Sequence, residues 1–508
     1  MKKIILSLTI LFYCFYVTAQ EKKPPTFISD SLDNYITKGM NDWNIPGLSV
    51  AIIKDGDVVF IKGFGITNID SKEPVDENTL FMIGSNTKAF TATMLSILQQ
   101  SGTLNLTDKV QKWMPEFRLN NSLASKEINI IDLLSHRIGF ETFQGDFTYW
   151  ASNLTRAEVI QKMSLIKAPY DFRTRWGYCN AAYVTAGELI HRITGKSWEK
   201  TVKDSILIPL KMNRTLMLTD ELKNAQNVAS PYTIINNSLT KIPITNINNL
   251  AHAGSMSSSA KDMTHWLLAH LNNGKINEEQ LLSARSIKTI RSPSSILGID
   301  PRDDKETHFY LYGMGLGIKD RDGKLVYSHT GAVDGFLSSV MFVPEEKLGI
   351  IVLTNTDQNN FFQNLTNEIQ DAYLGLPYQN YSTLSLERFK KDELNDDLRI
   401  DSLRNIVTYN YKPSLPLKYY SGKYINEVYG EIEIKIEKNK LNIYFSNHPD
   451  LIGKLEHLRK DNYLCTYSNP TFGIVEIPFK IKNDEVTGLT LRVADYIEFT
   501  PYEFNKTN

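Results

Sequence analysis

The sequence is poor in cysteine and carries almost no net charge. Only three of its 508 residues are cysteines, and 56 Lys and Arg against 57 Asp and Glu leave a formal net charge of −1. So few cysteines exclude a disulfide-stapled scaffold, and stability must therefore come from burial. The balanced charge gives no sign of nucleic-acid binding. With 42% apolar and 22% charged residues, the composition is that of a globular protein, and the length predicts two or three domains.

Long apolar runs are missing except at the N-terminus. There, Lys2 and Lys3 precede an apolar run over residues 4–17, which ends in small residues up to Ala19. This pattern predicts a signal peptide over residues 1–19 and a periplasmic or secreted protein. The run is short of the roughly 20 apolar residues that span a bilayer, although an uncleaved anchor is the alternative. We expect no stable membrane insertion after cleavage.

Several motifs of other hydrolases are absent. No Gly-x-Ser-x-Gly occurs, which argues against an α/β-hydrolase elbow. His-Glu-x-x-His is absent too, and His265 and His270 are five residues apart, off a shared helical face, so we expect no metal site. Cys14 lies inside the apolar run without the small residues of a lipoprotein cleavage site. The two remaining cysteines, Cys179 and Cys465, are expected to stay unpaired.

Hydrophobic periodicity predicts an α/β or α+β domain over residues 28–377. Residues 48–53 and 58–61 read as two strands of a hairpin, joined by a turn that contains Gly56. Residues 85–100 carry apolar side chains at helical spacing, and Gly102 follows as a stop signal. The remaining patterns predict helices over 128–135, 181–194 and 260–271, and strands over 325–327, 337–343 and 348–353.

The last part of the chain has a different period. Residues 378–414 are polar and predict a helical linker, the alternative being a solvated face of the neighbouring domain. Beyond them, Ile432, Ile434 and Ile436 alternate with charged residues, as in an antiparallel strand with one dry face. Residues 415–508 are therefore predicted to form a small barrel or sandwich.

Ser85 and Lys88 are the first candidates for chemistry. The Ser-x-x-Lys spacing on a helix brings a hydroxyl and an amine onto one face, close enough for the amine to take the hydroxyl proton. The pattern occurs five times, and most copies must be chance matches on solvated surfaces; the others begin at Ser164, Ser197, Ser238 and Ser258. Only Ser85 directly follows a glycine and opens an apolar helix.

Two further motifs follow in the same predicted domain. In Tyr178-Cys179-Asn180, the phenol could shuttle a proton and the amide could hold a substrate carbonyl. His329-Thr330-Gly331 follows a strand whose edge could pair with an extended peptide. Each tripeptide is weak alone, because a tyrosine capping a core or a loop histidine would look the same.

The order of the three motifs resembles the serine β-lactamase and penicillin-binding-protein superfamily. The resemblance covers about residues 30–375 and is to the branch of class C β-lactamases, DD-peptidases and esterases, the serine peptidases of family S12. Other stretches resemble this branch as well: Leu133-Leu134-Ser135-His136, Trp176-Gly177, Ile208-Pro209-Leu210 and Ala253-Gly254-Ser255.

The resemblance implies a catalytic role for each motif. Ser85 would be the acylated nucleophile and Lys88 its proton acceptor, with Tyr178 assisting proton transfer. Asn180 would bind the substrate amide, while His329, Thr330 and Gly331 would stand in the place of the Lys-Thr-Gly box. The backbone N–H groups of Ser85 and Ala332 would form the oxyanion hole. No metal or organic cofactor is implied.

The histidine in this box departs from the β-lactamase pattern. A lysine there holds the carboxylate of a β-lactam or D-Ala terminus, whereas His329 would be charged only partly near neutral pH. The box resembles that of D-aminopeptidases, and residues from about 415 resemble a lipocalin-like domain found behind many members.

The leading hypothesis is a serine hydrolase that cleaves an amide or ester in a small peptide, D-amino-acid-containing or peptidoglycan-derived. The alternatives are a β-lactamase or DD-carboxypeptidase, an esterase, and a non-catalytic penicillin- or peptidoglycan-binding sensor. A small-molecule or peptide substrate is expected in each case, and the sequence leaves the oligomeric state open.

Overall fold

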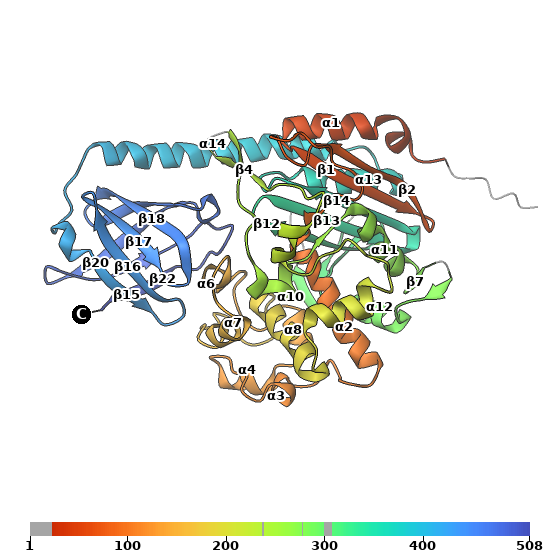
Figure 1. Ribbon diagram of the computed structural model, residues 1–508, viewed down its shortest axis with the longest axis horizontal. Helices are drawn as coiled ribbons and strands as arrows, with labels where there is room; N and C mark the ends of the chain where they lie inside the picture. Colours follow the sequence, from red (N-terminus) through yellow and green to blue (C-terminus); the bar gives the residue numbers. More distant parts are fainter. Residues whose placement is uncertain (1–22, 236–237, 277, 299–306, 508) are drawn as a thin grey trace, which may run out of the picture.

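The structure is a computed structural model that describes residues 23–235, 238–276, 278–298 and 307–507 (Figure 1). The predicted signal peptide lies outside the described residues. None of the helices within these ranges has the length and apolar character needed to cross a membrane. Cys179 and Cys465 are buried free thiols, as expected.

The first domain is built on an eight-stranded antiparallel sheet. The strands lie in the order β2-β1-β14-β13-β12-β11-β10-β9. Their bounds are β1 Gly47–Lys54, β2 Asp57–Gly65, β9 Ser295–Gly298, β10 Tyr310–Tyr312, β11 Gly317–Arg321, β12 Lys324–Val333, β13 Phe336–Val343 and β14 Leu348–Thr354. The predicted hairpin is confirmed, since β1 pairs with β2 across a turn in which Asp55 and Gly56 have positive φ.

Both faces of the sheet are covered, which explains the continuous apolar run of β14. Ile350 and Val352 belong to the core under α1 (Leu32–Asp42) and α13 (Phe361–Leu374). Ile351 and Leu353 point the other way, into the core shared with α2 (Thr87–Gln100) and α11 (Ala260–Leu271). Successive side chains of a strand alternate between faces, so a strand between two helical layers needs apolar residues throughout.

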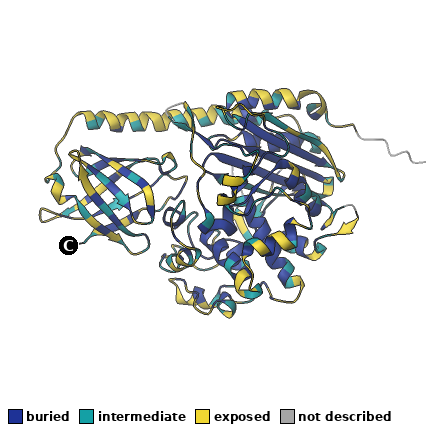
Figure 2. Ribbon diagram, in the orientation of Figure 1, coloured by how far each residue is buried: buried dark blue, intermediate teal, exposed yellow. Residues whose placement is uncertain are grey.

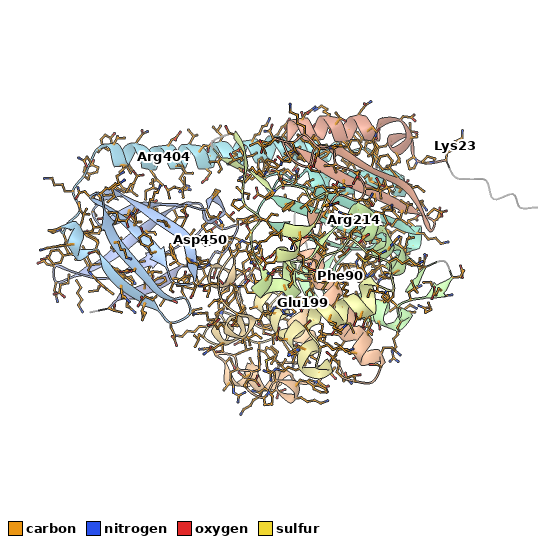
Figure 3. The ribbon with its side chains drawn as sticks, in the orientation of Figure 1. Lys23, Phe90, Glu199, Arg214, Arg404 and Asp450 are labelled. Carbon is orange, nitrogen blue, oxygen red and sulfur yellow. The ribbon has the colours of Figure 1, made fainter. Side chains whose placement is uncertain are left out.

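A lobe of mostly short helices packs beside α2 and α11. Phe90 of α2, which is labelled in Figure 3, stacks on Trp266 of α11 with ring centroids 4.0 Å apart and so joins these two helices. The other helices of the lobe are α3 Val110–Trp113, α4 Ser122–Glu127, α5 Ile130–Leu134, α6 Asp146–Tyr149, α7 Arg156–Met163, α8 Asn180–Thr194, α9 Trp198–Val202, α10 Ala251–Gly254 and α12 Ala284–Ile290. The described residues of the domain also form three two-stranded sheets, with strands β3 Phe81–Met82, β4 Tyr232–Ile235, β5 Ser238–Lys241, β6 Ser257–Ser258, β7 Lys275–Ile276 and β8 Glu279–Gln280.

Some predicted boundaries differ from the structure. The helix predicted from residue 85 begins at Thr87, because Ser85 belongs to a 3₁₀ turn ahead of it. The helix predicted over 128–135 is shortened to α5, because Asn129 caps its start: the Asn129 side-chain oxygen accepts a hydrogen bond from the amide of Asp132. The strand predicted over 325–327 extends to Val333.

Helix α14 connects this domain to the last one. It covers Tyr381–Thr408 within the predicted polar segment, and Figure 2 shows that most of its surface is exposed. Near its start, Ser382 accepts a hydrogen bond from Trp43 Nε1 at 3.0 Å. Near its end, Leu403 packs on Leu458 of the last domain.

The last domain is a closed eight-stranded antiparallel barrel. Its strands are β15 Gly422–Asn426, β16 Gly430–Glu437, β17 Lys440–Phe445, β18 His448–Arg459, β19 Asn462–Tyr467, β20 Ile474–Lys482, β21 Glu485–Leu491 and β22 Tyr502–Lys506. Ile432 and Ile434 are buried inside as their alternation predicts, whereas Ile436 is 43% exposed because it lies at the end of β16. The structure thus confirms the predicted architecture of a mixed domain with an antiparallel sheet between helices, followed by a small β-barrel.

Candidate active site

Ser85 stands on a 3₁₀ turn held tightly against the sheet. The turn begins at Gly84, which has a φ of +51°, and a Cβ on that glycine would lie only 2.7 Å from the amide nitrogen of Ala332. Glycine therefore allows β12 to approach the turn that carries Ser85. Asn86 Nδ2 donates a 2.8 Å hydrogen bond to Ser338 Oγ on β13, which fixes the turn. The structure thus brings the backbone of Ala332 next to Ser85.

Lys88 is completely buried beside Ser85. Its Nζ donates hydrogen bonds to Ser85 Oγ at 3.0 Å, to Asn180 Oδ1 at 2.7 Å and to the carbonyl of Ala253 at 2.8 Å. Burial lowers the pKa of this amine to about 7, although the charge of Asp146 opposes the shift. A large fraction of Lys88 is therefore unprotonated at neutral pH, so this amine can accept the proton of Ser85.

Tyr178 lies over the same amine, but its pKa is shifted up, whereas that of Lys88 is shifted down. The centroid of its ring is 4.7 Å from Lys88 Nζ. Burial raises the pKa of the phenol well above its usual value, while a hydrogen bond with Ser85 opposes this shift. The phenol therefore keeps its proton at neutral pH. In the resting site it is Lys88 that can act as base, and Tyr178 can donate a proton.

Asn180 joins Lys88 to a buried carboxyl group. It is the first residue of α8, and its Oδ1 accepts from Lys88 while its Nδ2 donates to Asp146 Oδ2 at 2.6 Å. Burial and the charge of Glu498 raise the pKa of Asp146 well above its ordinary value. An amide nitrogen carries two hydrogens, so one remains for a substrate carbonyl.

The sequence suggested that the His329-Thr330-Gly331 box follows a strand. In the structure, the box and Ala332 lie within β12. Pairing with β11 ends at Ser328, so within the described part of the chain no strand covers this edge of β12 beyond that residue. A free edge of this kind can pair with an extended peptide. A Cβ on Gly331 would lie 1.9 Å from the carbonyl oxygen of Ile83, so the close packing of β12 against the Ser85 turn requires glycine.

The imidazole of His329 is neutral at neutral pH. Its Nδ1 lies 2.5 Å from the carbonyl oxygen of Thr330, which can only accept, so Nδ1 carries the hydrogen. Its Nε2 then accepts from the hydroxyl of Tyr312 at 2.9 Å. Burial and the charge of Lys88 lower its pKa to about 3. The expectation of a partly charged histidine is therefore wrong, because a model-compound pKa takes no account of this burial.

Sequence reasoning missed several groups of the site. No motif pointed to Asp146 or Tyr312, which are far from their partners in sequence and gave no pattern to find. His136 was noted only as part of a family-like stretch, yet its Nδ1 accepts a 3.0 Å hydrogen bond from the amide of Cys179 and so holds the segment between Tyr178 and Asn180. Only the tertiary contacts identify these roles.

Comparison with known proteins places the chain in a family. Residues 32–374 match the Beta-lactamase family, and residues 409–506 match a domain of unknown function, DUF3471. The chain is 26% identical over 450 residues to the unguisins hydrolase ungD of Aspergillus violaceofuscus, covering 81% of this chain and 77% of that protein. It is 27% identical over 366 residues to the protein flp of Staphylococcus aureus strain COL, covering 72% of this chain and 70% of that protein.

Solved structures show the same fold. An octameric penicillin-binding protein homologue from Pyrococcus abyssi matches with a TM-score of 0.60 and 24% identity, covering 94% of this chain and 99% of that one. A D-stereospecific amidohydrolase from Streptomyces sp. matches with a TM-score of 0.56 and 22% identity, covering 68% of this chain and 98% of that one. The first family match alone spans well over half of the residues. The chain belongs to the beta-lactamase family and is a serine hydrolase.

Proposed function

We propose that the protein is a secreted hydrolase that cleaves amide or ester bonds through an acyl-enzyme on Ser85. The observation that carries this proposal is the 3.0 Å contact between Lys88 Nζ and Ser85 Oγ, made by an amine whose pKa burial lowers to about 7. A base of this pKa next to a hydroxyl is the arrangement that nucleophilic catalysis by serine requires.

In the proposed acylation, Ser85 Oγ attacks the substrate carbonyl while Lys88 takes its proton. The developing oxyanion is held by the backbone N–H groups of Ser85 and Ala332, the latter brought close by the packing of β12 against Gly84. The Tyr178 phenol gives its proton to the leaving group and regains one from the Lys88 ammonium. The bond to the leaving group breaks as the acyl-enzyme forms.

Deacylation uses the same groups in reverse. A water molecule loses a proton to Lys88 and attacks the acyl carbon, and the proton passes to Ser85 Oγ as the acid leaves. The remaining hydrogen on Asn180 Nδ2 and the free edge of β12 hold the substrate beside Ser85. No metal or organic cofactor takes part in these steps.

The substrate we favour is a small peptide or amide, D-amino-acid-containing or peptidoglycan-derived, with no carboxylate at the His329 subsite. The neutral imidazole of His329 offers no fixed cation there, which argues against β-lactams and D-Ala-terminated peptides. The name of one similar protein, a D-stereospecific amidohydrolase, agrees with an amide substrate, and that of another, an unguisins hydrolase, agrees with hydrolysis.

A substrate panel tests this proposal. D- and L-amino-acid amides, a short-chain ester and a penicillin are incubated with the protein and with Ser85→Ala. We expect turnover of an amide or ester that disappears in the variant. Turnover that persists in the variant would refute Ser85 as nucleophile, and a single stoichiometric adduct without turnover would favour the sensor alternative.

Export is part of the proposal and has its own test. Expression of the full chain in a bacterium, followed by fractionation and N-terminal sequencing, should give a mature protein beginning at Gln20 outside the cytoplasm. A full-length cytoplasmic protein would contradict secretion.

A further inference from the structure

The barrel reaches the active site through the short helix α6. This helix lies on the side of the helical lobe that faces the barrel (Figure 1). Phe147 is fully buried in the core of the barrel, where its ring stacks on Tyr429 with centroids 4.8 Å apart. The preceding residue, Asp146, points into the catalytic domain and accepts the hydrogen bond from Asn180. One turn of helix therefore contacts both the barrel core and the catalytic polar groups.

Glu498 of the barrel holds the backbone on both sides of Asp146. It lies between β21 and β22 and is 2% exposed. Its two carboxylate oxygens accept hydrogen bonds from the amides of Gly145 at 2.8 Å and Phe147 at 3.0 Å. Tyr502 of β22 donates to the same carboxylate at 2.9 Å. The barrel thus supplies the buried anchor that fixes the position of α6.

The contacts form a continuous chain from the barrel to the catalytic amine. Glu498 binds the backbone of α6, Asp146 Oδ2 accepts from Asn180 Nδ2 at 2.6 Å, and Asn180 Oδ1 accepts from Lys88 Nζ at 2.7 Å. Because an amide has one oxygen and one nitrogen, the Asp146 contact decides which end of Asn180 faces Lys88. A shift of α6 would release that orientation.

We propose that Glu498 is a positioning residue for Lys88, so that the C-terminal barrel forms part of the support of the active site. The consequence for catalysis rests on the proposed function, whereas the link from Glu498 to Lys88 does not.

The charges of Glu498 and Asp146 make this link measurable through the pKa of Lys88. Burial raises the pKa of Glu498 to about 7, and its charge helps to raise the pKa of Asp146. Removing that charge lets Asp146 ionise more easily, and an ionised Asp146 favours the charged form of Lys88. The other titratable groups that face this cluster are Tyr149 and Tyr502 around the two carboxyls, and His136, Tyr178, Cys179, Tyr183 and His329 around Lys88 and Asp146.

The test compares Glu498→Gln with Lys162→Met in the full chain. Lys162 Nζ donates to the carbonyls of Val428 at 2.8 Å and Tyr429 at 2.9 Å. It therefore joins the same two domains but makes none of the hydrogen bonds that link Glu498 to Asn180. The pKa of Lys88 is measured without substrate, from the ¹³Cε shift of labelled lysine, assigned by its loss in Lys88→Ala. Hydrolysis of p-nitrophenyl acetate gives kcat and KM.

We expect Glu498→Gln to raise the pKa of Lys88 by about one unit and to lower kcat at pH 7 about fivefold, because the unprotonated fraction of Lys88 falls from about a half to about a tenth, with KM changed less than about threefold. Lys162→Met should leave all three quantities unchanged. Tyr502→Phe, which removes one hydrogen bond but keeps the carboxylate, should shift the same quantities in the same direction by less, and it serves if Glu498→Gln does not fold.

Two results would overturn the inference. One is an unchanged Lys88 pKa in both Glu498→Gln and Tyr502→Phe, and the other is an equal shift in Lys162→Met, which would mean that any loosening of the domain interface has this effect. If the wild-type protein shows no turnover, the proposed function fails, while the Lys88 titration still decides the Glu498 link.

Discussion

The active site and the barrel interior are both rich in tyrosine, but the two regions use these side chains differently. Around Lys88, the hydroxyl groups take part in a hydrogen-bonded network: Tyr312 bonds to His329, and Tyr183 donates to the carbonyl of Leu134 at 2.6 Å. In the barrel, the rings fill the interior around Phe147 of the other domain, and their hydroxyl groups bond to separate partners, such as His448 for Tyr429 and Glu498 for Tyr502. Aromatic content alone therefore does not identify a site; the buried polar groups that the rings enclose do.

The largest expected effect comes from removing the proposed base, Lys88, or the proposed nucleophile, Ser85. Ser85→Ala and Lys88→Ala should each lower kcat/KM by at least about 10⁴-fold, or roughly 5.5 kcal/mol, because such groups act as a unit. Steady-state hydrolysis of an ester measures this. Ser164→Ala is the matched control. Ser164 begins another Ser-x-x-Lys pattern, which lies on the surface, so its loss should leave full activity. Activity above about a tenth of wild type in Lys88→Ala would contradict the role of that residue.

The second prediction tests the apolar region. Phe147→Ala leaves a cavity among the rings of Tyr429, Phe472 and Tyr502, and it should lower the free energy of unfolding by about 3–5 kcal/mol. Urea denaturation followed by tryptophan fluorescence measures it. Leu123→Ala, at a side chain that is 64% exposed, should change stability by less than about 0.5 kcal/mol. A loss below about 1 kcal/mol for Phe147→Ala would show that α6 is not packed into the barrel as described.

The third prediction concerns pH. Lys88 must be unprotonated to accept a proton, so kcat/KM should be constant above its pKa of about 7 and fall about tenfold per pH unit below it, or 1.4 kcal/mol at one unit. A pH–rate profile between pH 5 and 9 gives the answer. A rate that does not change between pH 5 and 8 would exclude Lys88 as the base.

The smallest expected effect is at His329. Its pKa of about 3 means that the imidazole gains no charge between pH 6 and 7. The ratio of kcat/KM for a carboxylate-bearing ester to that for its neutral analogue should therefore stay constant over this range. Taking the ratio cancels the titration of Lys88, because it affects both substrates equally. A ratio that falls as pH rises from 6 to 7 would show an imidazolium binding the carboxylate.

The sequence predicts the fold well because the fold depends on local periodicity. The alternation of Ile432 and Ile434 and the helical spacing after Ser85 each identify an element directly. The candidate site is predicted only where motifs carry it. Glu498 and Gly145 are 353 residues apart, and no pattern in the sequence joins them. The charge of His329 was mispredicted for a related reason, since burial is a property of the folded chain.

The central claim is that Ser85 becomes acylated. The most direct test is the intact mass of the full protein, quenched with acid within milliseconds to seconds of mixing with p-nitrophenyl acetate, with Ser85→Ala treated in parallel. The account predicts a mass increase of one acetyl group in the wild-type protein, mapped by peptide sequencing to Ser85, and none in the variant. The same adduct in Ser85→Ala, or wild-type turnover with no adduct at any quench time, would contradict it.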